Sequence, residues 1–157
     1  MKKNTQKKCV INKGFTLIEI LLVLGIIAIL AGIVLVAINP SRQFKQARDS
    51  QRVSNVNAIL NAIGQNIADH RGVFTCDGTP TTLPVSPGEI MKTMGGFDIA
   101  PCLVPIYLAQ LPYDPSIIPP QTGYDTGYTV SRDASTDRIT IGANSEIDPT
   151  IPITVTR

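Results

Sequence analysis

The chain has little of what most enzymes use for chemistry. Among its 157 residues there is one histidine, His70, and three cysteines, with neither a CxxC nor an HxxxH spacing. A zinc site needs such ligands, so no metal site is expected on this ground. There is also no GxSxG motif and no histidine paired with serine or cysteine. We therefore predict that the protein is not an enzyme.

Acidic residues are missing from the first 14 positions, which carry five lysines. The formal net charge of +2 comes from this segment, because the rest of the chain has a formal charge of −3. From Gly72 onward, 4 basic residues face 9 acidic ones. Contacts to phosphate need lysine or arginine, so we predict no nucleic-acid partner.

Charge is also scarce in the run from Phe15 to Ile38, whose only charged residue is Glu19. As a helix these 24 residues would be about 36 Å long, enough to cross a bilayer core of about 30 Å. A carboxylate inside a membrane costs about 2.5–3.5 kcal/mol on insertion scales. The sequence therefore predicts a membrane-spanning helix in which Glu19 needs a partner.

The basic segment 1–14 ends in Gly14, before the apolar run. An ordinary secretory signal has its small-residue cleavage site after a shorter apolar region, so this segment is not one. The lysines favour a cytoplasmic leader and an extracytoplasmic C-terminal domain. Four basic residues beyond the run weaken this preference: Arg42, Lys45, Arg48 and Arg52.

A second, amphipathic helical segment is expected over residues 39–71. Asn39-Pro40 predicts a kink or short break, with Ser41 as the N-cap of the resumed helix. His70-Arg71-Gly72 is typical of a helix end. Apolar residues recur at helical spacing and predict a face packed on the chain's own β domain: Val53, Val56, Leu60, Ile63 and Ile67.

Residues 72–157 are rich in turns, and 11 of the 12 prolines lie beyond residue 79. "GEIMKTMGG" is interpreted as a short helix, and "VPIYLAQLPYDPSIIPPQTG" as extended. "GYTVSRDASTDRITIGAN" alternates like a β-hairpin, and "IPITVTR" offers a third strand. The sequence thus indicates an α+β protein with a small β-rich domain.

Two cysteines, Cys76 and Cys102, lie beyond the apolar run, whereas Cys9 lies among the leader lysines. If that side is extracytoplasmic, a Cys76–Cys102 disulfide is expected. The alternative is two buried free thiols.

The stretch "KGFTLIEILLVLGIIAILAGI" closely resembles the N-terminus of type IV pilins and type II secretion pseudopilins. The resemblance implies a pilin-like fold, with a long N-terminal helix packed on a small antiparallel sheet. It divides the chain into a leader (1–14), a transmembrane and polymerisation helix (15–38), an amphipathic continuation (39–71) and an extracytoplasmic domain (72–157). It also implies that a prepilin peptidase cuts between Gly14 and Phe15 and methylates the new amine of Phe15.

The resemblance further implies a structural subunit that assembles into a pilus-like filament. Its partners would be other copies and related pilins, the prepilin peptidase, membrane lipid and an inner-membrane assembly platform. After cleavage, Glu19 could pair with the Phe15 amine of a neighbour. Alternatively, Glu19 satisfies its own helix N-terminus. Gly25, Ala28 and Gly32 would allow close helix approach, although small residues are common in membrane helices.

Two other functions stay open at this point. The chain could be the major pseudopilin of a type II secretion system, or a single-pass anchored binding module that does not polymerise. No cofactor is expected. Some major pseudopilins bind calcium, and the nearest carboxylates here are Asp125, Asp133 and Asp137, but their spacing matches no known calcium loop and aspartates are common in turns.

Overall fold

A computed structural model describes residues 14–91, 95–117 and 124–157. The chain forms two compact units that divide at Pro40. The expected leader 1–14 thus lies outside the described residues except for Gly14. The same holds for parts of the expected helix "GEIMKTMGG" (92–94) and of the expected extended segment (118–123).

The first unit contains the helix α1, Leu17–Ala37. The second unit begins at Ser41, within the first turn of the helix α2, which spans Pro40–Asp69. The predicted break at Asn39-Pro40 is confirmed, since α1 ends before it and α2 starts at the proline. Proline fits the first helical position because its missing N–H has no helical acceptor there. Ser41 lies inside the first turn, so its prediction as the N-cap is wrong.

The second unit folds around a four-stranded antiparallel sheet in the order β3-β4-β5-β6. Its strands are β3 (Gly88–Met91), β4 (Asp125–Arg132), β5 (Ile139–Ala143) and β6 (Ile153–Thr156). The predicted hairpin is β4–β5, with Val130 opposite Ile141, and the predicted third strand is β6. A small pair, β1 (Thr75–Cys76) and β2 (Thr79–Pro80), and the short helix α3 (Ala100–Leu103) complete the unit.

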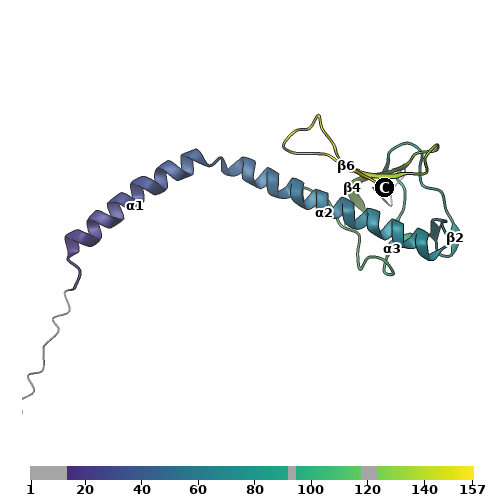
Figure 1. The fold of residues 1–157 in the computed structure, drawn as a ribbon, viewed down its shortest axis with the longest axis horizontal. Helices are drawn as coiled ribbons and strands as arrows, with labels where there is room; N and C mark the ends of the chain where they lie inside the picture. The colour runs from purple at the N-terminus through teal and green to yellow at the C-terminus, as the bar shows by residue number, and fades with distance from the viewer. Residues whose placement is uncertain (1–13, 92–94, 118–123) are drawn as a thin grey trace, which may run out of the picture. The chain divides into compact units, whose positions relative to one another are not determined.

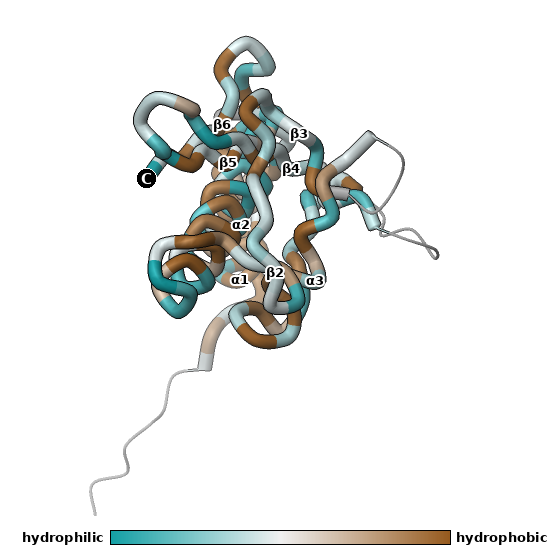
Figure 2. The backbone as a smooth tube through the Cα atoms, turned by 90° about the vertical axis from the view of Figure 1, so that its right-hand side faces the viewer, coloured by the Kyte–Doolittle hydropathy of each residue, from teal (hydrophilic) through white to brown (hydrophobic). Residues whose placement is uncertain are grey.

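The core lies between α2 and one face of this sheet (Figures 1 and 2). The fully buried side chains of α2 include Val56, Ile59 and Ile63, and those of the sheet include Tyr128 and Ile141. Together with α1 in the first unit, these elements give the predicted α+β layout.

Two details of the amphipathic stripe differ from the prediction. Val53 is 43% exposed, whereas Asn66, predicted off the stripe, is 1% exposed. The core begins at Val56 because one turn earlier α2 faces polar loops, which bring partners for Asp49 and Arg52.

The predicted helix at "GEIMKTMGG" is also wrong, because Gly88–Met91 forms β3. Gly88 pairs with Val130 of β4, and Ile90 is completely buried. An added Cβ at Gly88 would lie 3.1 Å from the Pro84 ring. Glycine at this position therefore lets the strand backbone lie close to Pro84. Pairing with β4 supplies hydrogen bonds that a short isolated helix would lack.

Candidate functional site

The N-terminal end of α1 is capped by Thr16. Its backbone is extended, and its Oγ1 accepts a hydrogen bond from the Glu19 N–H at 3.3 Å. Threonine is a favoured N-cap because its hydroxyl satisfies a donor that lacks a helical acceptor. The Thr16 hydroxyl therefore caps this end of the helix through the backbone of Glu19.

The Glu19 carboxylate lies in the first turn of α1 and is exposed. Within the described part of the chain, neither a hydrogen bond nor an ion pair involves this carboxylate. Its position favours it through the helix dipole, but only by about 0.3–1 kcal/mol. That is less than the cost of a charged carboxylate at membrane depth.

Gly14 and Phe15 lie just before this turn, in non-helical backbone. The Phe15 side chain is 79% exposed, and a Cβ added to Gly14 would meet nothing within 4 Å. The peptide bond between them is therefore open to another protein. The structure thus brings Gly14, Phe15 and Glu19 together within one short stretch.

The helix α1 is apolar on every side. From Leu17 to Leu35 it is long and apolar enough to cross a membrane, and none of it is buried by the chain itself. A Cβ added at Gly25 or Gly32 would lie within 4 Å of no other described segment. In the absence of lipid or other helices, this surface would be exposed to water at a large free-energy cost.

A cluster of charged side chains forms around Arg52 of α2, and no motif in the sequence indicated it. Arg52 is 2% exposed. It donates to Asp114 through Nε (2.6 Å) and Nη2 (2.9 Å), to Asp49 through Nη1 (2.6 Å) and to Glu146 through Nη2 (2.6 Å). Arg48 donates to Glu146 from Nε at 2.8 Å. We call these five residues the Arg52 cluster.

The carboxylates of the Arg52 cluster stay ionised. Hydrogen bonds from Arg48 and Arg52 hold the pKa of Glu146 well below its usual range. Burial alone would raise the pKa of Asp49 and Asp114, but it is outweighed. The hydrogen bond from the Arg52 guanidinium lowers the pKa of Asp114. The hydrogen bond from the backbone N–H of Glu146 is the largest of the effects that lower the pKa of Asp49.

This cluster joins three segments that are far apart in the sequence. Asp49 accepts the backbone N–H groups of Glu146 (3.0 Å) and Ile147 (3.2 Å) and the hydroxyl of Ser145 (2.7 Å). Asp114 lies between α3 and β4, whereas Glu146 follows β5. The cluster therefore fixes both loops on α2. The only sequence signal was the Asp49-Arg52 spacing, one helical turn, which is too common to indicate a site.

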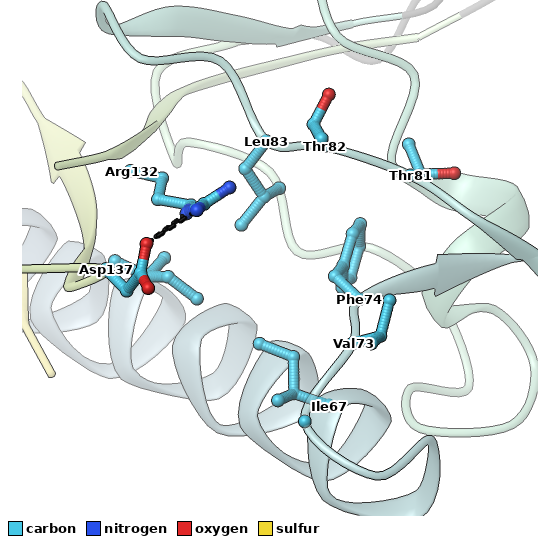
Figure 3. A pocket seen from close by; sticks show the side chains of 10 residues that line it. Ile67, Val73, Phe74, Thr81, Thr82, Leu83, Arg132 and Asp137 are labelled. Carbon is cyan, nitrogen blue, oxygen red and sulfur yellow. Dashed lines mark hydrogen bonds and ion pairs between the residues drawn. The ribbon is translucent and has the colours of Figure 1, made fainter. Parts of the chain in front are cut away.

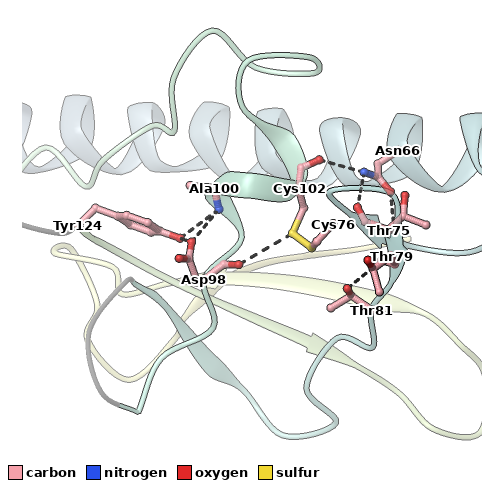
Figure 4. The surroundings of a disulfide bond; sticks show 9 residues. All are labelled: Asn66, Thr75, Cys76, Thr79, Thr81, Asp98, Ala100, Cys102 and Tyr124. Carbon is pink, nitrogen blue, oxygen red and sulfur yellow. Dashed lines mark hydrogen bonds between the residues drawn. A yellow bond between two sulfur atoms is a disulfide. The ribbon is translucent and has the colours of Figure 1, made fainter.

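The cysteines Cys76 and Cys102 form a disulfide that joins β1 to α3 (Figure 4). Beside it, the buried Asn66 of α2 donates to the carbonyls of Thr75 and Cys102, both at 2.9 Å, and accepts the Thr75 N–H at 2.9 Å. The disulfide and Asn66 together attach the C-terminal end of α2 to the segments that follow it.

The second unit has a cavity of about 400 Å³ whose lining includes the apolar side chains of Ile67, Phe74 and Leu83 (Figure 3). Its one lining carboxylate, Asp137, accepts hydrogen bonds from Arg132. A general base or nucleophile needs an available group, and this carboxylate is already engaged.

The three aspartates considered for calcium each make local turn contacts. Asp125 accepts the Gly127 N–H, and Asp137 accepts from Arg132. Hydrogen bonds from Ser135 and Thr136 lower the pKa of Asp133 to about 2. In the ranges that the structure describes, no three His, Cys, Asp or Glu residues lie close enough to hold a metal ion. Calcium binding stays an untested hypothesis, which a calcium titration would address.

Comparison with known proteins bears on the N-terminal end of the chain. The family model described as the prokaryotic N-terminal methylation motif matches residues 11–35. No curated protein and no solved structure gives a significant match. The matched stretch holds Gly14, Phe15 and Glu19 and is the prepilin motif of type IV pilins and pseudopilins.

The motif and the apolar helix indicate the kind of protein that this chain resembles. They support a pilin-like or pseudopilin subunit that a prepilin peptidase processes. They also support a membrane-anchored precursor that later enters a surface filament. Such a subunit has a structural role.

Proposed function

We propose that this chain is a structural subunit of a type IV pilus-like filament and that it assembles through α1. One observation carries the proposal. A carboxylate that no described residue pairs with, Glu19, lies in the first turn of an apolar helix that the described residues do not bury, within the methylation motif.

Processing would create the partner that Glu19 needs. Cleavage between Gly14 and Phe15 releases an ammonium group at Phe15, and methylation of this amine keeps its positive charge. The exposure of Phe15 supports access by the peptidase. Thr16 already caps the helix, so the Glu19 carboxylate is available for a neighbouring chain.

In the filament, the Phe15 ammonium of one subunit would meet the Glu19 carboxylate of the next. Both charges would lie among apolar helices, where an unpaired charge is expensive and removing one partner of a pair costs about 3–5 kcal/mol. The pair would therefore favour one axial stagger of the subunits. Gly25 and Gly32 would let the helices approach closely.

The second unit would be displayed outside the membrane, with the leader in the cytoplasm. Its core and the Arg52 cluster support a domain that keeps its fold when α1 moves from lipid into a filament. A pseudopilus of a type II secretion system remains the alternative, since the same processing and packing serve both assemblies. An anchored module that does not polymerise is the second alternative, and it would need no new N-terminus.

Mass spectrometry of the full-length protein extracted from host membranes tests the proposal. We expect a chain that begins at Phe15 with a methylated amine. A matched variant, Gly14→Leu, should keep its leader, because the bulky leucine side chain would obstruct the peptidase next to the bond that it cuts. A wild-type chain that retains residues 1–14 would contradict the proposal and favour the anchored module.

A further inference from the structure

The strand β6 forms one outer edge of the four-stranded sheet, and β3 forms the other. The outer edge of β3 is partly occupied, since the Phe97 N–H donates to the Glu89 carbonyl at 2.7 Å and Ile90 bridges to Phe97. In the part of the chain that the structure describes, β6 pairs with β5 and with no other strand. The outer edge of β3 is therefore partly bonded, whereas the outer edge of β6 is open among the described residues.

The pairing with β5 shows which backbone groups of β6 point outward. Ile139 and Arg157 exchange both of their hydrogen bonds, at 2.9 and 3.0 Å. In an antiparallel pair such bonded positions alternate along the strand, so Val155 and Ile153 also point toward β5. The N–H and C=O groups of Thr154 and Thr156 must then point away from the sheet. No hydrogen bond from the described residues reaches them.

Over the four residues of β6, this edge has no proline, charge or bulge, although Pro152 precedes the strand and Arg157 follows it. Natural edges carry proline, charged side chains or bulges that prevent pairing with another strand. The residues of β6, Ile-Thr-Val-Thr, include none of these, and their pairing with β5 is regular. All three residue types in β6 favour extended backbone. The edge is therefore a ready template for one more strand.

We infer that the β6 edge pairs with the β6 edge of a second copy of this chain. The two strands run antiparallel about a two-fold axis at Val155. Thr154 then lies opposite Thr156 of the second copy and exchanges both backbone hydrogen bonds with it, and Thr156 does the same with Thr154. Val155 faces Val155 of the second copy.

The sequence of β6 is complementary to itself in this register. It places threonine against threonine and valine against valine, which are favourable cross-strand pairs. The two Arg157 side chains lie at opposite ends of the paired strands, so like charges do not face each other. Anchoring in one membrane would hold copies at a high effective concentration, which compensates for a short strand.

A two-fold contact also tells which copies can pair. Head-to-tail contacts build a polar helical filament, whereas a two-fold contact closes on itself. The paired chains therefore belong to the membrane pool or to two adjacent filaments. The inference does not depend on the filament proposed above.

Disulfide cross-linking of the full-length protein in membranes from cells that lack an assembly machinery tests the pairing. In a Cys9→Ser background, Val155→Cys should give a covalent dimer on mild oxidation. Residues at a non-hydrogen-bonded antiparallel position have Cα atoms about 4.5 Å apart, within the range that a disulfide spans. Ile106→Cys, at a side chain that is 79% exposed, measures cross-linking by random collision.

A proline variant distinguishes pairing from collision. Thr156→Pro removes an outward N–H and no backbone hydrogen bond to β5, but it also removes the exposed contact between the Thr156 and Thr140 hydroxyls at 2.8 Å. The backbone pairing with β5 is kept, so the fold should survive, and Thr154→Pro is a second variant of the same kind. Added to Val155→Cys, either change should reduce the dimer to the Ile106→Cys level, with an unchanged unfolding midpoint showing intact folding. A Val155→Cys dimer no more abundant than the Ile106→Cys dimer, or one that persists in both folded proline variants, would overturn the inference.

Discussion

At the scale of single residues, Arg52 shows how one side chain organises the second unit. It is almost fully buried, and its guanidinium satisfies carboxylates from α2 and from two loops. A planar group with several fixed donors can do this, whereas the compact ammonium of lysine cannot hold the same arrangement. Because the charges are enclosed, removing one partner leaves the others buried and unpaired, which lowers the free energy of unfolding strongly.

Replacing Arg52 by methionine should therefore destabilise the second unit strongly. The change keeps most of the volume but leaves Asp49, Asp114 and Glu146 without their shared cation. We expect a loss of about 3–5 kcal/mol in the free energy of unfolding, measured by denaturant unfolding of the full-length protein in detergent.

The matched control for this variant is Arg132→Met. Arg132 also pairs with an aspartate, Asp137, but the two side chains are 38% and 72% exposed. Exposed pairs contribute about 0–1 kcal/mol, so this variant should be nearly neutral. Similar losses in both variants would show that enclosure of the Arg52 cluster is not what makes it stabilising.

At the scale of secondary structure, the end of α2 depends on contacts from other segments. Arg71 and Gly72 have positive φ values of 58° and 92°, and the Gly72 N–H donates to the Ile67 carbonyl at 2.8 Å. This closes the helix as the sequence predicted. Asn66 and the disulfide then hold the following β1 segment and α3 beside the helix end.

Removing the disulfide should loosen this region. The cysteines are separated by 26 positions, and closing a loop of that length stabilises by about 3–4 kcal/mol on the chain-entropy account. We expect Cys76→Ser with Cys102→Ser to lower the free energy of unfolding by about this amount, and Cys9→Ser to leave it unchanged. On a non-reducing gel the wild-type protein should migrate faster than after reduction. Equal migration, with both thiols free to alkylate, would contradict the bridge.

How much of the second unit was predictable from sequence depended on the range of the contacts. The β4–β5 hairpin was predictable because alternation and a turn are local. In contrast, β3 was interpreted as a helix, since its strand state depends on pairing with Val130 about 40 residues away in sequence. The burial of Asn66 was missed for a similar reason, as its partners are backbone groups of Thr75 and Cys102.

The Arg52 cluster was the least predictable feature. Arg48, Asp49 and Arg52 could equally have been exposed on an amphipathic helix, because nothing near them in the sequence indicates their partners. What buries Arg52 is the arrival of Asp114 and Glu146 from loops whose positions follow from the sheet. By contrast, the N-terminal motif is local in sequence, so its residues could be named in advance.

At the scale of the whole molecule, the two units have different requirements. The second unit has a buried core of its own and satisfies its internal charges. The first unit presents an apolar helix with one carboxylate that no described residue pairs with. Such a helix is stable in lipid or among copies of itself. The Glu19 carboxylate would gain a charged partner only among copies.

Substituting Glu19 with glutamine tests this claim most directly. The change keeps the side-chain size but removes the charge that would pair with a neighbouring Phe15 amine, and Thr16→Val is the matched control that alters the helix cap while keeping Glu19. Membrane blots and mass spectrometry would establish insertion and cleavage, and sheared-filament preparations would measure assembly. We predict that Glu19→Gln is inserted and processed but yields few or no filaments, whereas Thr16→Val assembles. Normal filaments from processed Glu19→Gln protein would contradict the account.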